Sequence, residues 1–415
     1  MRAFVRECIP SLPRVVWFIQ LGNVVNFFGF GLVLPFELIY LHDHRGFSLP
    51  TSGLIVSTIM TVNVLCTGPA GSLVDRVGGK TLLFVGSTLQ GIGYGSLAFV
   101  TAPWHGFVAS AVTGLGAGMT GPAAGALVTA LTTREERIAA FTVARVSINF
   151  GIGLGSVVAG AIVASGTLRS FQTLYLLNAA TFFGYLCFVA FVPNARGAAH
   201  AADDAPRGYR FVLRHRLFLA VVAANFVFVV VGYTLFGYAM PIFARHDAGV
   251  STKAIGAVFG INTIFIIVVQ LPLVRILRGV RRRAVLALMC AAWGVGCLVT
   301  LAAAHVGSTA AAVAVLGVGG IAFGIGECLH AIGVQPFVAD LAPPHLMGRY
   351  MALFGISFSL GLAGGPAASG GALALSPSLP WLGGAVAILA FIPLLFAAPA
   401  GAGVRAAPSA SSSAG

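Results

Sequence analysis

Charged side chains are scarce in this sequence. Lysine, arginine, aspartate and glutamate make up 8% of its 415 residues, and hydrophobic residues make up 58%, whereas soluble domains carry roughly 25% charged residues. So little charge could not cover the surface of a soluble chain of this length, which excludes soluble globular domains, disordered chains and coiled coils. The mean hydropathy of +0.96 predicts an integral membrane protein rich in spanning helices.

Paired cysteines and common catalytic motifs are missing as well. The six cysteines are isolated, and neither CxxC nor HExxH occurs, so a disulfide scaffold and a cysteine or histidine metal motif are excluded. The segment GGKT at Gly78–Thr81 lacks the earlier glycine of a phosphate loop. AASG at Ala367–Gly370 resembles a rhomboid protease motif without its first glycine. We therefore expect no enzyme activity, no cofactor and no metal.

In place of charge, the sequence has a series of apolar runs. Each is long enough for a helix across a bilayer core, which takes ~20 residues. The runs lie at 14–41, 51–74, 80–101, 106–131, 138–165, 171–193, 217–243, 254–277, 284–304, 309–338, 349–374 and 379–399. Strands of a membrane barrel would alternate in polarity over ~10 residues, and these runs do not. We predict an all-α integral membrane protein with twelve transmembrane helices.

The basic residues between these runs indicate the orientation. With the N-terminus inside, 19 Lys and Arg fall in cytoplasmic segments, 4 fall in outside loops, and Arg145 falls within a span. This bias predicts a multi-pass protein of the cell (inner or plasma) membrane with both termini in the cytoplasm. The net charge of +13 is scattered between the spans rather than gathered on one face. We therefore expect a lipid bilayer, and no nucleic acid, as its partner.

The longest internal polar stretch divides the chain into two halves. It covers residues 194–216, a cytoplasmic linker between predicted six-helix bundles at 1–193 and 217–400, and a low-complexity tail at 401–415 is predicted to be disordered. The halves form a weak repeat: GLGAG and NFGIGLGSVVAG in the first correspond to GVGGIAFG and GISFSLGLAGGPAASG about 200 residues later. Secondary transporters often contain such repeats, with the substrate near the midplane between them.

The loop between the second and third runs carries a motif. Its sequence GSLVDRVGGK, at 71–80, resembles the loop signature of the major facilitator superfamily in residue type, spacing and position, with Gly79 in place of a second arginine. The resemblance covers about 14–400 and implies two pseudo-symmetric six-helix bundles. It also implies a cytoplasmic latch between the halves, formed by Gly71, Asp75, Arg76, Gly78 and Lys80. The alternative is a solvated turn that follows the positive-inside rule.

Two departures bear on the subtype. Drug:proton antiporters of this superfamily carry an arginine in the fourth helix, where this chain has Ser110. They also carry a glycine- and proline-rich motif in the fifth helix, where this chain reads Gly151-x-x-x-Gly155-Ser156 without the proline. The eleventh run has the better copy, with Gly365-Pro366. The glycines are expected to pack helices closely, and the departures argue against antiport without excluding it.

One acidic residue lies deep within a predicted span. Glu327 falls inside the 309–338 run, where a charge costs ~2.5–3.5 kcal/mol and burial favours the neutral form. His330 lies three residues further on and shares its helix face. A carboxyl group that gains and loses a proton as a cavity opens and closes suits proton coupling, so we predict this role for Glu327 and His330. The alternative is a permanently protonated glutamate bonded to a neighbouring helix.

Residues in other spans mark a candidate substrate cavity, which the resemblance implies is lined by helices 1, 4, 7 and 10. From those helices come the polar residues Gln20, Asn23, Asn26, Asn225 and Tyr233, with Phe236 as part of an apolar wall. The fifth run adds Arg145 and, four residues later, Asn149. Hydrogen bonding between helices is the alternative role for the amides. Arg145 could instead extend to the membrane interface or pair with Asp75 or Glu327. Glu37, near the outer end of the first run, is expected in water at the cavity mouth.

These features favour a secondary active transporter that works by alternating access. One embedded acid, many phenylalanines and few fixed charges predict export of amphipathic or apolar small molecules, with proton coupling. We expect a monomer that binds a small-molecule substrate and protons. The alternative is a facilitator or symporter that imports a small metabolite, and Arg145 would then favour an organic anion.

Overall fold

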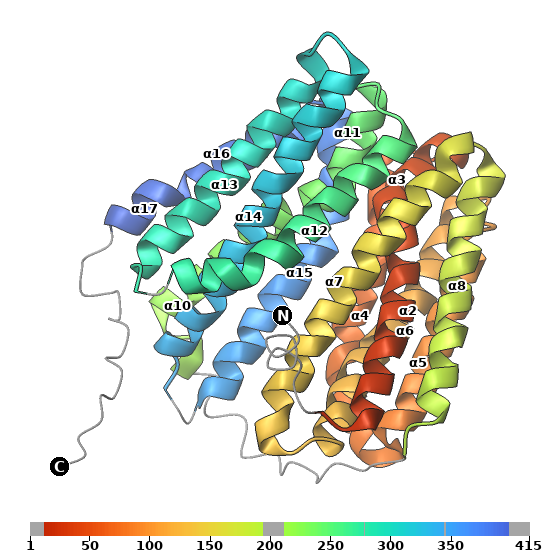
Figure 1. Cartoon of the computed structure of the whole chain (residues 1–415), viewed down its shortest axis with the longest axis vertical. Coiled ribbons are helices and arrows are strands. Elements are labelled where there is room, and N and C mark those ends of the chain that lie inside the picture. The colour runs from red at the N-terminus through yellow and green to blue at the C-terminus, as the bar shows by residue number, and fades with distance from the viewer. Residues whose placement is uncertain (1–11, 194–210, 278, 344–345, 398–415) are drawn as a thin grey trace, which may run out of the picture.

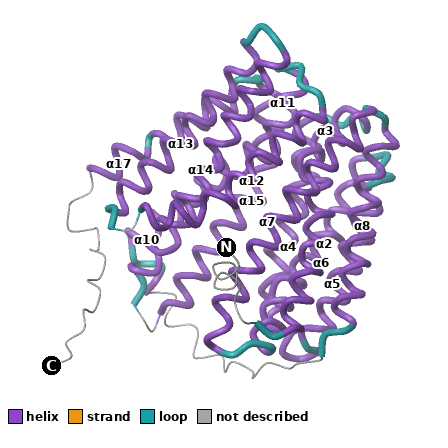
Figure 2. Tube along the Cα trace, viewed as in Figure 1, coloured by secondary structure: helices purple, strands orange, loops and turns teal. Residues whose placement is uncertain are grey.

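The computed structural model describes residues 12–193, 211–277, 279–343 and 346–397. Nearly all of them are helical, and no strand occurs in this part of the chain (Figure 2). Ten helical segments are long and apolar enough to cross a membrane. The helix α5 and the shorter apolar pair α16–α17 bring the helical rods of the described residues to twelve, so the predicted all-α fold with twelve helices is confirmed.

The first half contains six helical rods. Their parts are α2 (Arg14–Val33), η1 (Leu34–Phe36), α3 (Glu37–Ile39), η2 (Tyr40–His44), α4 (Leu49–Val77), α5 (Gly79–Leu97), α6 (Pro103–Ala130), α7 (Arg134–Ile162), η3 (Val163–Ser165) and α8 (Leu168–Ala190). The first rod is interrupted near its end, where Pro35 lies in a 3-10 turn and Tyr40–His44 form a π-helical turn. The sequence predicted one plain helix there.

The second half repeats this arrangement. Its parts are α10 (Arg216–Val229), η4 (Val230–Ala239), α11 (Met240–His246), α12 (Thr252–Ile276), α13 (Arg282–Ala302), η5 (Ala303–His305), α14 (Thr309–Leu341), α15 (Met347–Leu375), α16 (Leu379–Leu389) and α17 (Phe391–Ala397). The rod α10–η4–α11, like the first rod of the other half, contains a π-helical segment. Such segments often occur at functional sites.

Short polar signals set where these helices begin and end. Ser48, Thr133, Thr167, Ser251 and Ser308 each accept a hydrogen bond at a helix N-terminus, which satisfies an otherwise free backbone N–H. Thr133 and Glu136 form a complete capping box. Between α4 and α5, Gly78 adopts φ +87°, a conformation that glycine tolerates far better than other residues.

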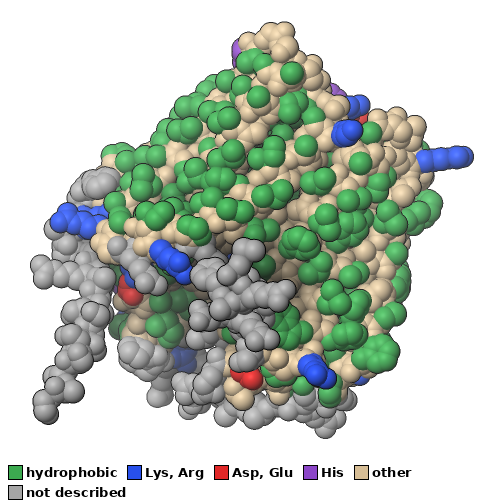
Figure 3. Space-filling model, viewed as in Figure 1, with side chains coloured by type: hydrophobic (Ala, Val, Ile, Leu, Met, Phe, Trp, Pro, Cys, Tyr) green, Lys and Arg blue, Asp and Glu red, His purple; other side chains and the backbone are tan. Residues whose placement is uncertain are grey.

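The two halves lie side by side (Figure 1), with α2 to α8 on one side and α10 to α17 on the other. Large apolar side chains such as Leu65, Ile264 and Val386 are 69%, 63% and 70% exposed. Hydrophobic side chains spread along the helices, and most Lys and Arg lie near the helix ends (Figure 3). This pattern fits a surface that contacts lipid. Most of the predicted linker and all of the tail 401–415 lie outside the described residues, so the domain boundaries stay a prediction.

We call the helix ends near Arg14, Ala190 and Arg216 the inner end, following the predicted orientation, and the opposite side the outer end. In the outer half, α4 packs against α15, and α7 packs against α12. A Cβ atom at Gly370 would clash with the Leu49 carbonyl oxygen, and one at Gly160 would come within 3.1 Å of the Gly256 Cα atom. Backbones therefore meet directly across the bundle interface. The glycines were expected to pack helices closely, and the structure shows that some of these contacts join the two bundles.

Candidate functional site

A cavity of about 210 Å³ lies between the two halves. Its lining comes from the first rod and α7 on one side and from η4, α12 and α14 on the other. The lining residues are Leu34, Arg145, Asn149, Ile152, Tyr233, Phe236, Gly237, Phe259, Asn262, Thr263, Ile266, Gln270, Glu327, Cys328 and Ala331. Five predicted site residues are among them, namely Arg145, Asn149, Tyr233, Phe236 and Glu327. Because both bundles contribute, a relative movement of the bundles would change the cavity.

A cation and a carboxyl group face this cavity from opposite bundles. Arg145 is exposed and Glu327 is half-buried. They are near enough to interact electrostatically, and Asn262 lies beside the Glu327 side chain. Among the described residues no ion pair joins Arg145 to Glu327, and the Asn262 amide donates to the Gly320 carbonyl at 2.9 Å. The cavity therefore places a guanidinium, a carboxyl group and an amide around one space.

His330 lies behind the cavity wall in a polar network of the second bundle. The Asn225 amide donates to the Ser357 hydroxyl at 2.8 Å, and its oxygen lies 2.9 Å from His330 Nε2. Because that oxygen only accepts, Nε2 donates. His330 Nδ1 lies 3.2 Å from the Tyr233 hydroxyl, which reaches the cavity. His330 and Asn225 do not line the cavity themselves; they contact it through Tyr233.

The polar stripe of α2 is not part of the cavity lining. Asn23 donates to the Gln20 side-chain oxygen at 2.9 Å, and Gln20 is 2% exposed. Neither of these residues nor Asn26 lines the cavity. Gln20 Nε2 and Asn26 Oδ1 are buried without a hydrogen-bond partner in the described part of the chain. Helix periodicity grouped the three correctly on one face, but it could not indicate which neighbour that face meets.

The structure corrects the expectation for Glu37, which is buried rather than wet. It lies on α3 and is 2% exposed. Its carboxyl group acts electrostatically on Tyr94, Tyr175 and Tyr238, and Tyr238 belongs to the opposite bundle. The bend formed by η1 and η2 and the closed outer interface bury this side chain, which sequence position alone could not predict.

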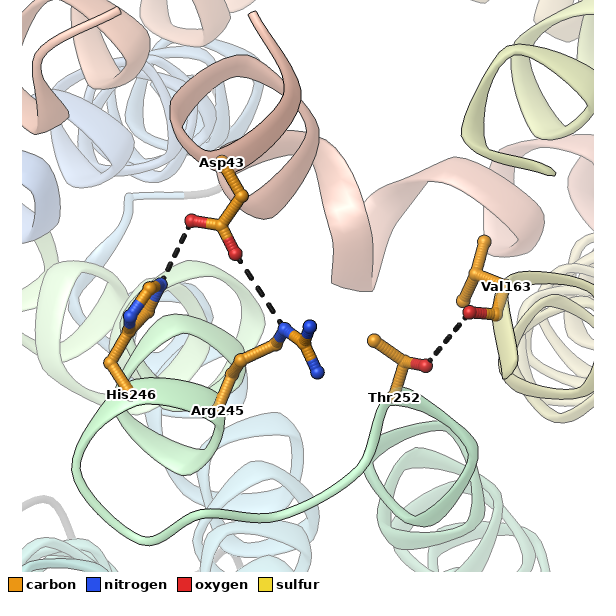
Figure 4. Close-up of polar contacts among 5 residues, drawn as sticks. All are labelled: Asp43, Val163, Arg245, His246 and Thr252. Carbon is orange, nitrogen blue, oxygen red and sulfur yellow. Dashed lines mark hydrogen bonds and ion pairs between the residues drawn. The ribbon is translucent and has the colours of Figure 1, made fainter. Parts of the chain in front are cut away.

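The outer side of the cavity is closed by polar bridges between the bundles (Figure 4). Asp43 of η2 approaches Arg245 Nε at 3.6 Å and His246 Nε2 at 2.8 Å. The Thr252 hydroxyl donates to the Val163 carbonyl at 3.0 Å. Closer to the midplane, the Ala367 N–H donates to the Ser57 hydroxyl at 2.9 Å. Together with the glycine contacts, these bridges separate the cavity from the outer surface.

A family model described as Major Facilitator Superfamily matches residues 19–278 and 226–413. The chain belongs to the Major Facilitator Superfamily. An uncharacterized transporter of this type from Bacillus subtilis, YqjV, is 24% identical over 362 residues, covering 86% of this chain and 85% of that protein. The multidrug resistance protein MdtH of Klebsiella pneumoniae is 25% identical over 390 residues, covering 91% and 92%.

Solved structures of transporters have the same architecture. A mutant of the nucleoside transporter NupG superposes with a TM-score of 0.79 at 14% identity, covering 92% of this chain and 99% of that one. A POT family transporter in complex with 5-aminolevulinic acid gives a TM-score of 0.74 at 14% identity, covering 92% and 96%. At this identity, the likeness shows the superfamily fold alone.

The superfamily loop motif lies where α4 ends and α5 begins. In this conformation its Lys80 does not bridge the two bundles. Lys80 donates to the carbonyls of Ala190 and Val192 at 2.8 and 2.7 Å, at the end of α8 in its own bundle. Arg76 is exposed, and Gly71 has open space beside it. The side chain of Asp75 lies outside the described residues. A latch that forms when the outer end opens remains a prediction.

Three polar cavity residues of α12 were not predicted from the sequence, namely Asn262, Thr263 and Gln270. Asn262 and Gln270 are uncharged amides eight residues apart, so they share one face of a long apolar helix. That spacing is the signal that could have identified them. The resemblance implies a lining from helices 1, 4, 7 and 10, whereas α12 is the eighth span.

Proposed function

We propose that this superfamily member exports amphipathic or apolar small molecules in exchange for protons. The observation that carries the proposal is the Glu327 carboxyl group in a cavity between the two bundles, with Tyr233, Phe236 and Phe259 beside it. Aromatic side chains bind apolar surfaces of many shapes. The multidrug resistance relative MdtH supports the same class of substrate.

Glu327 would couple substrate and proton by competition. With the outer end closed, the cavity lets Glu327 exchange a proton, and a substrate that occupies the cavity favours its release. Outer opening would then release the substrate and allow the carboxyl group to be protonated again. His330 would sense the same event through the Tyr233 hydroxyl. One proton moving down ~150 mV supplies about 3.5 kcal/mol, enough for a gradient of roughly a few hundredfold.

The proposal includes a monomer in the plasma membrane with both termini in the cytoplasm. The cavity lining is contributed by both halves of one chain, which supports a monomeric transporter. The excess of Lys and Arg in predicted inner segments supports the orientation.

A proton-release assay tests the proposal. Inside-out vesicles that contain an internal pH dye receive a panel of lipophilic cations, neutral antibiotics and organic anions across an imposed proton gradient. We expect substrate-induced proton release in the wild type and its loss in Glu327→Gln. Glu136→Gln is the matched control, because Glu136 serves a capping box that glutamine can also complete. Release that persists in Glu327→Gln would contradict the assigned coupling residue.

The second candidate function is uptake of a small organic anion by a facilitator or symporter. The observation that favours it is Arg145, an exposed residue that lines the cavity beside Asn149 and has no ion pair within the described part of the chain. In the same panel, transport restricted to anions, independent of the gradient and lost in Arg145→Gln would favour this function over proton-coupled export.

A further inference from the structure

Three potential metal ligands gather at the outer end, outside the transport cavity. His42 and Asp43 lie in the π-helical turn of the first bundle, and His246 ends α11 of the second bundle. Their ligand atoms lie within 4.8 Å of one another. Figure 4 shows Asp43 pointing across the interface toward His246. The cluster therefore exists only while the two bundles are together at this end.

The orientation of His42 prepares it for a metal. His42 Nδ1 lies 2.7 Å from the Phe47 carbonyl oxygen. A carbonyl only accepts, so Nδ1 carries the hydrogen, and in the neutral ring Nε2 keeps its lone pair. Metal-ligating histidines are typically oriented in this way by a backbone carbonyl. The ring of His42 lies 5.9 Å from the ring of His246, measured between centroids.

The carboxylate of Asp43 divides its two oxygens between different partners. Oδ2 lies 3.6 Å from Arg245 Nε, and Oδ1 lies 2.8 Å from His246 Nε2. The other neighbouring charge, Arg45, is directed away and donates to the Tyr40 hydroxyl at 2.7 Å. His44 packs against Phe171. Oδ1 is shared with His246 alone, so it can bind a metal ion once the hydrogen on His246 Nε2 has left, while Arg245 opposes any cation at this place.

We propose that His42, Asp43 and His246 form a binding site for a divalent transition metal of the zinc class, which joins the two bundles at the outer end. Two imidazoles and one carboxylate are a common zinc ligand set, with water in the remaining position. For His246 to bind as a neutral imidazole, its hydrogen moves from Nε2 to Nδ1 through solvent, and the Nε2 lone pair and Asp43 Oδ1 then both face the metal. Zinc donors lie roughly 3.4 Å apart in tetrahedral geometry, so half-exposed side chains need only small rotations. The bound ion holds the outer end closed.

Zinc titration of the purified full-length chain tests this site. Any histidine tag is removed, and Zn²⁺ competes with a fluorescent zinc indicator. We expect one bound ion per chain in the wild type and at least tenfold weaker binding in His42→Ala, Asp43→Asn and His246→Ala. His305→Ala is the matched control. His305 is an exposed outer-end histidine whose ring also contacts a backbone carbonyl, that of Leu301, and its replacement leaves zinc binding unchanged.

Arg245→Gln gives a result in the opposite direction, which misfolding could not produce. Removing the guanidinium beside Asp43 strengthens zinc binding several-fold. Unchanged affinity in His246→Ala would overturn the bridging site. Affinity in Arg245→Gln no tighter than in the wild type would overturn the ligand role of Asp43, and with it the proposal.

Discussion

The outer and inner halves of the bundle interface hold two glutamates in opposite settings. Glu37 is 2% exposed and lies in the outer half, where the bundles are closed. Glu327 is half-buried and faces a cavity that contains Arg145 and Asn262. Both lie within apolar spans. The two acids thus differ in access: Glu327 lines a cavity, whereas Glu37 is enclosed by the protein in this conformation.

The contacts around Glu37 and around Glu327 also differ. The outer half is closed by backbone contacts at glycines and by the bridges of Asp43 and Thr252. In the inner half, polar side chains such as Arg145, Asn262 and Glu327 surround the cavity between the bundles. Opening the outer end would bring Glu37 to water, while Glu327 would lose its present surroundings. Three changes test this view, and their expected effects decrease in the order given.

Blocking outer closure should have the largest effect. Gly370→Val places a side chain against the Leu49 carbonyl and the Gly53 Cα atom, so α15 cannot approach α4 and the outer end stays open. We expect transport in vesicles to fall at least tenfold, and zinc binding at the outer cluster to weaken as well. The control is Gly371→Val, since a Cβ atom there meets nothing within 4 Å. Equal effects of the two variants would contradict closure at this contact.

Neutralising each acid separately should distinguish their roles. If substrate binding releases one proton from Glu327, affinity should rise with pH by up to about tenfold per unit. Glu327→Gln should remove this slope, because glutamine cannot release a proton. Glu37→Gln should retain the pH dependence of substrate affinity, since Glu37 is buried while the outer end is closed. Substrate affinity measured between pH 5.5 and 8.5 checks both. A slope lost only in Glu37→Gln would reverse the assignment.

Removing one bridge should have the smallest effect. Thr252→Val deletes the hydrogen bond to the Val163 carbonyl, a net loss of about 0.5–1.5 kcal/mol. We expect a roughly two- to tenfold shift toward outer opening, measured as faster maleimide labelling of a Ser57→Cys reporter. In the control Thr173→Val, the deleted hydroxyl bonds only the Arg169 carbonyl of its own helix, and labelling should not change.

The sequence was sufficient for most of the fold. Apolar runs separated by basic and turn residues predicted twelve helical spans, and the structure confirms them. These signals are local: a run of about 20 apolar residues must satisfy its backbone hydrogen bonds within itself in a membrane. The same local reasoning identified Glu327, because a single acid in a long apolar run is visible without any neighbour.

Sequence could not predict which faces of different helices would meet. Helix periodicity groups Gln20, Asn23 and Asn26, but the structure keeps them out of the cavity and brings Asn262 and Gln270 into it. It likewise predicted Glu37 in water, where tertiary packing buries it. The helix that carries a residue determines which of its sequence neighbours share a face with it. Which other helix packs against that face, and whether the side chain is then buried, depends on the tertiary structure.

The outer cluster makes the same point most sharply. Nothing in the spacing of His42 and Asp43 suggests a metal, and His246 lies 203 residues beyond Asp43 in the chain. The sequence by itself determined the helices, their predicted orientation and one embedded acid, because those depend on local hydrophobicity and charge. Only the tertiary structure decided the cavity, the sealed Glu37 and the three-residue cluster, because each requires two bundles to meet.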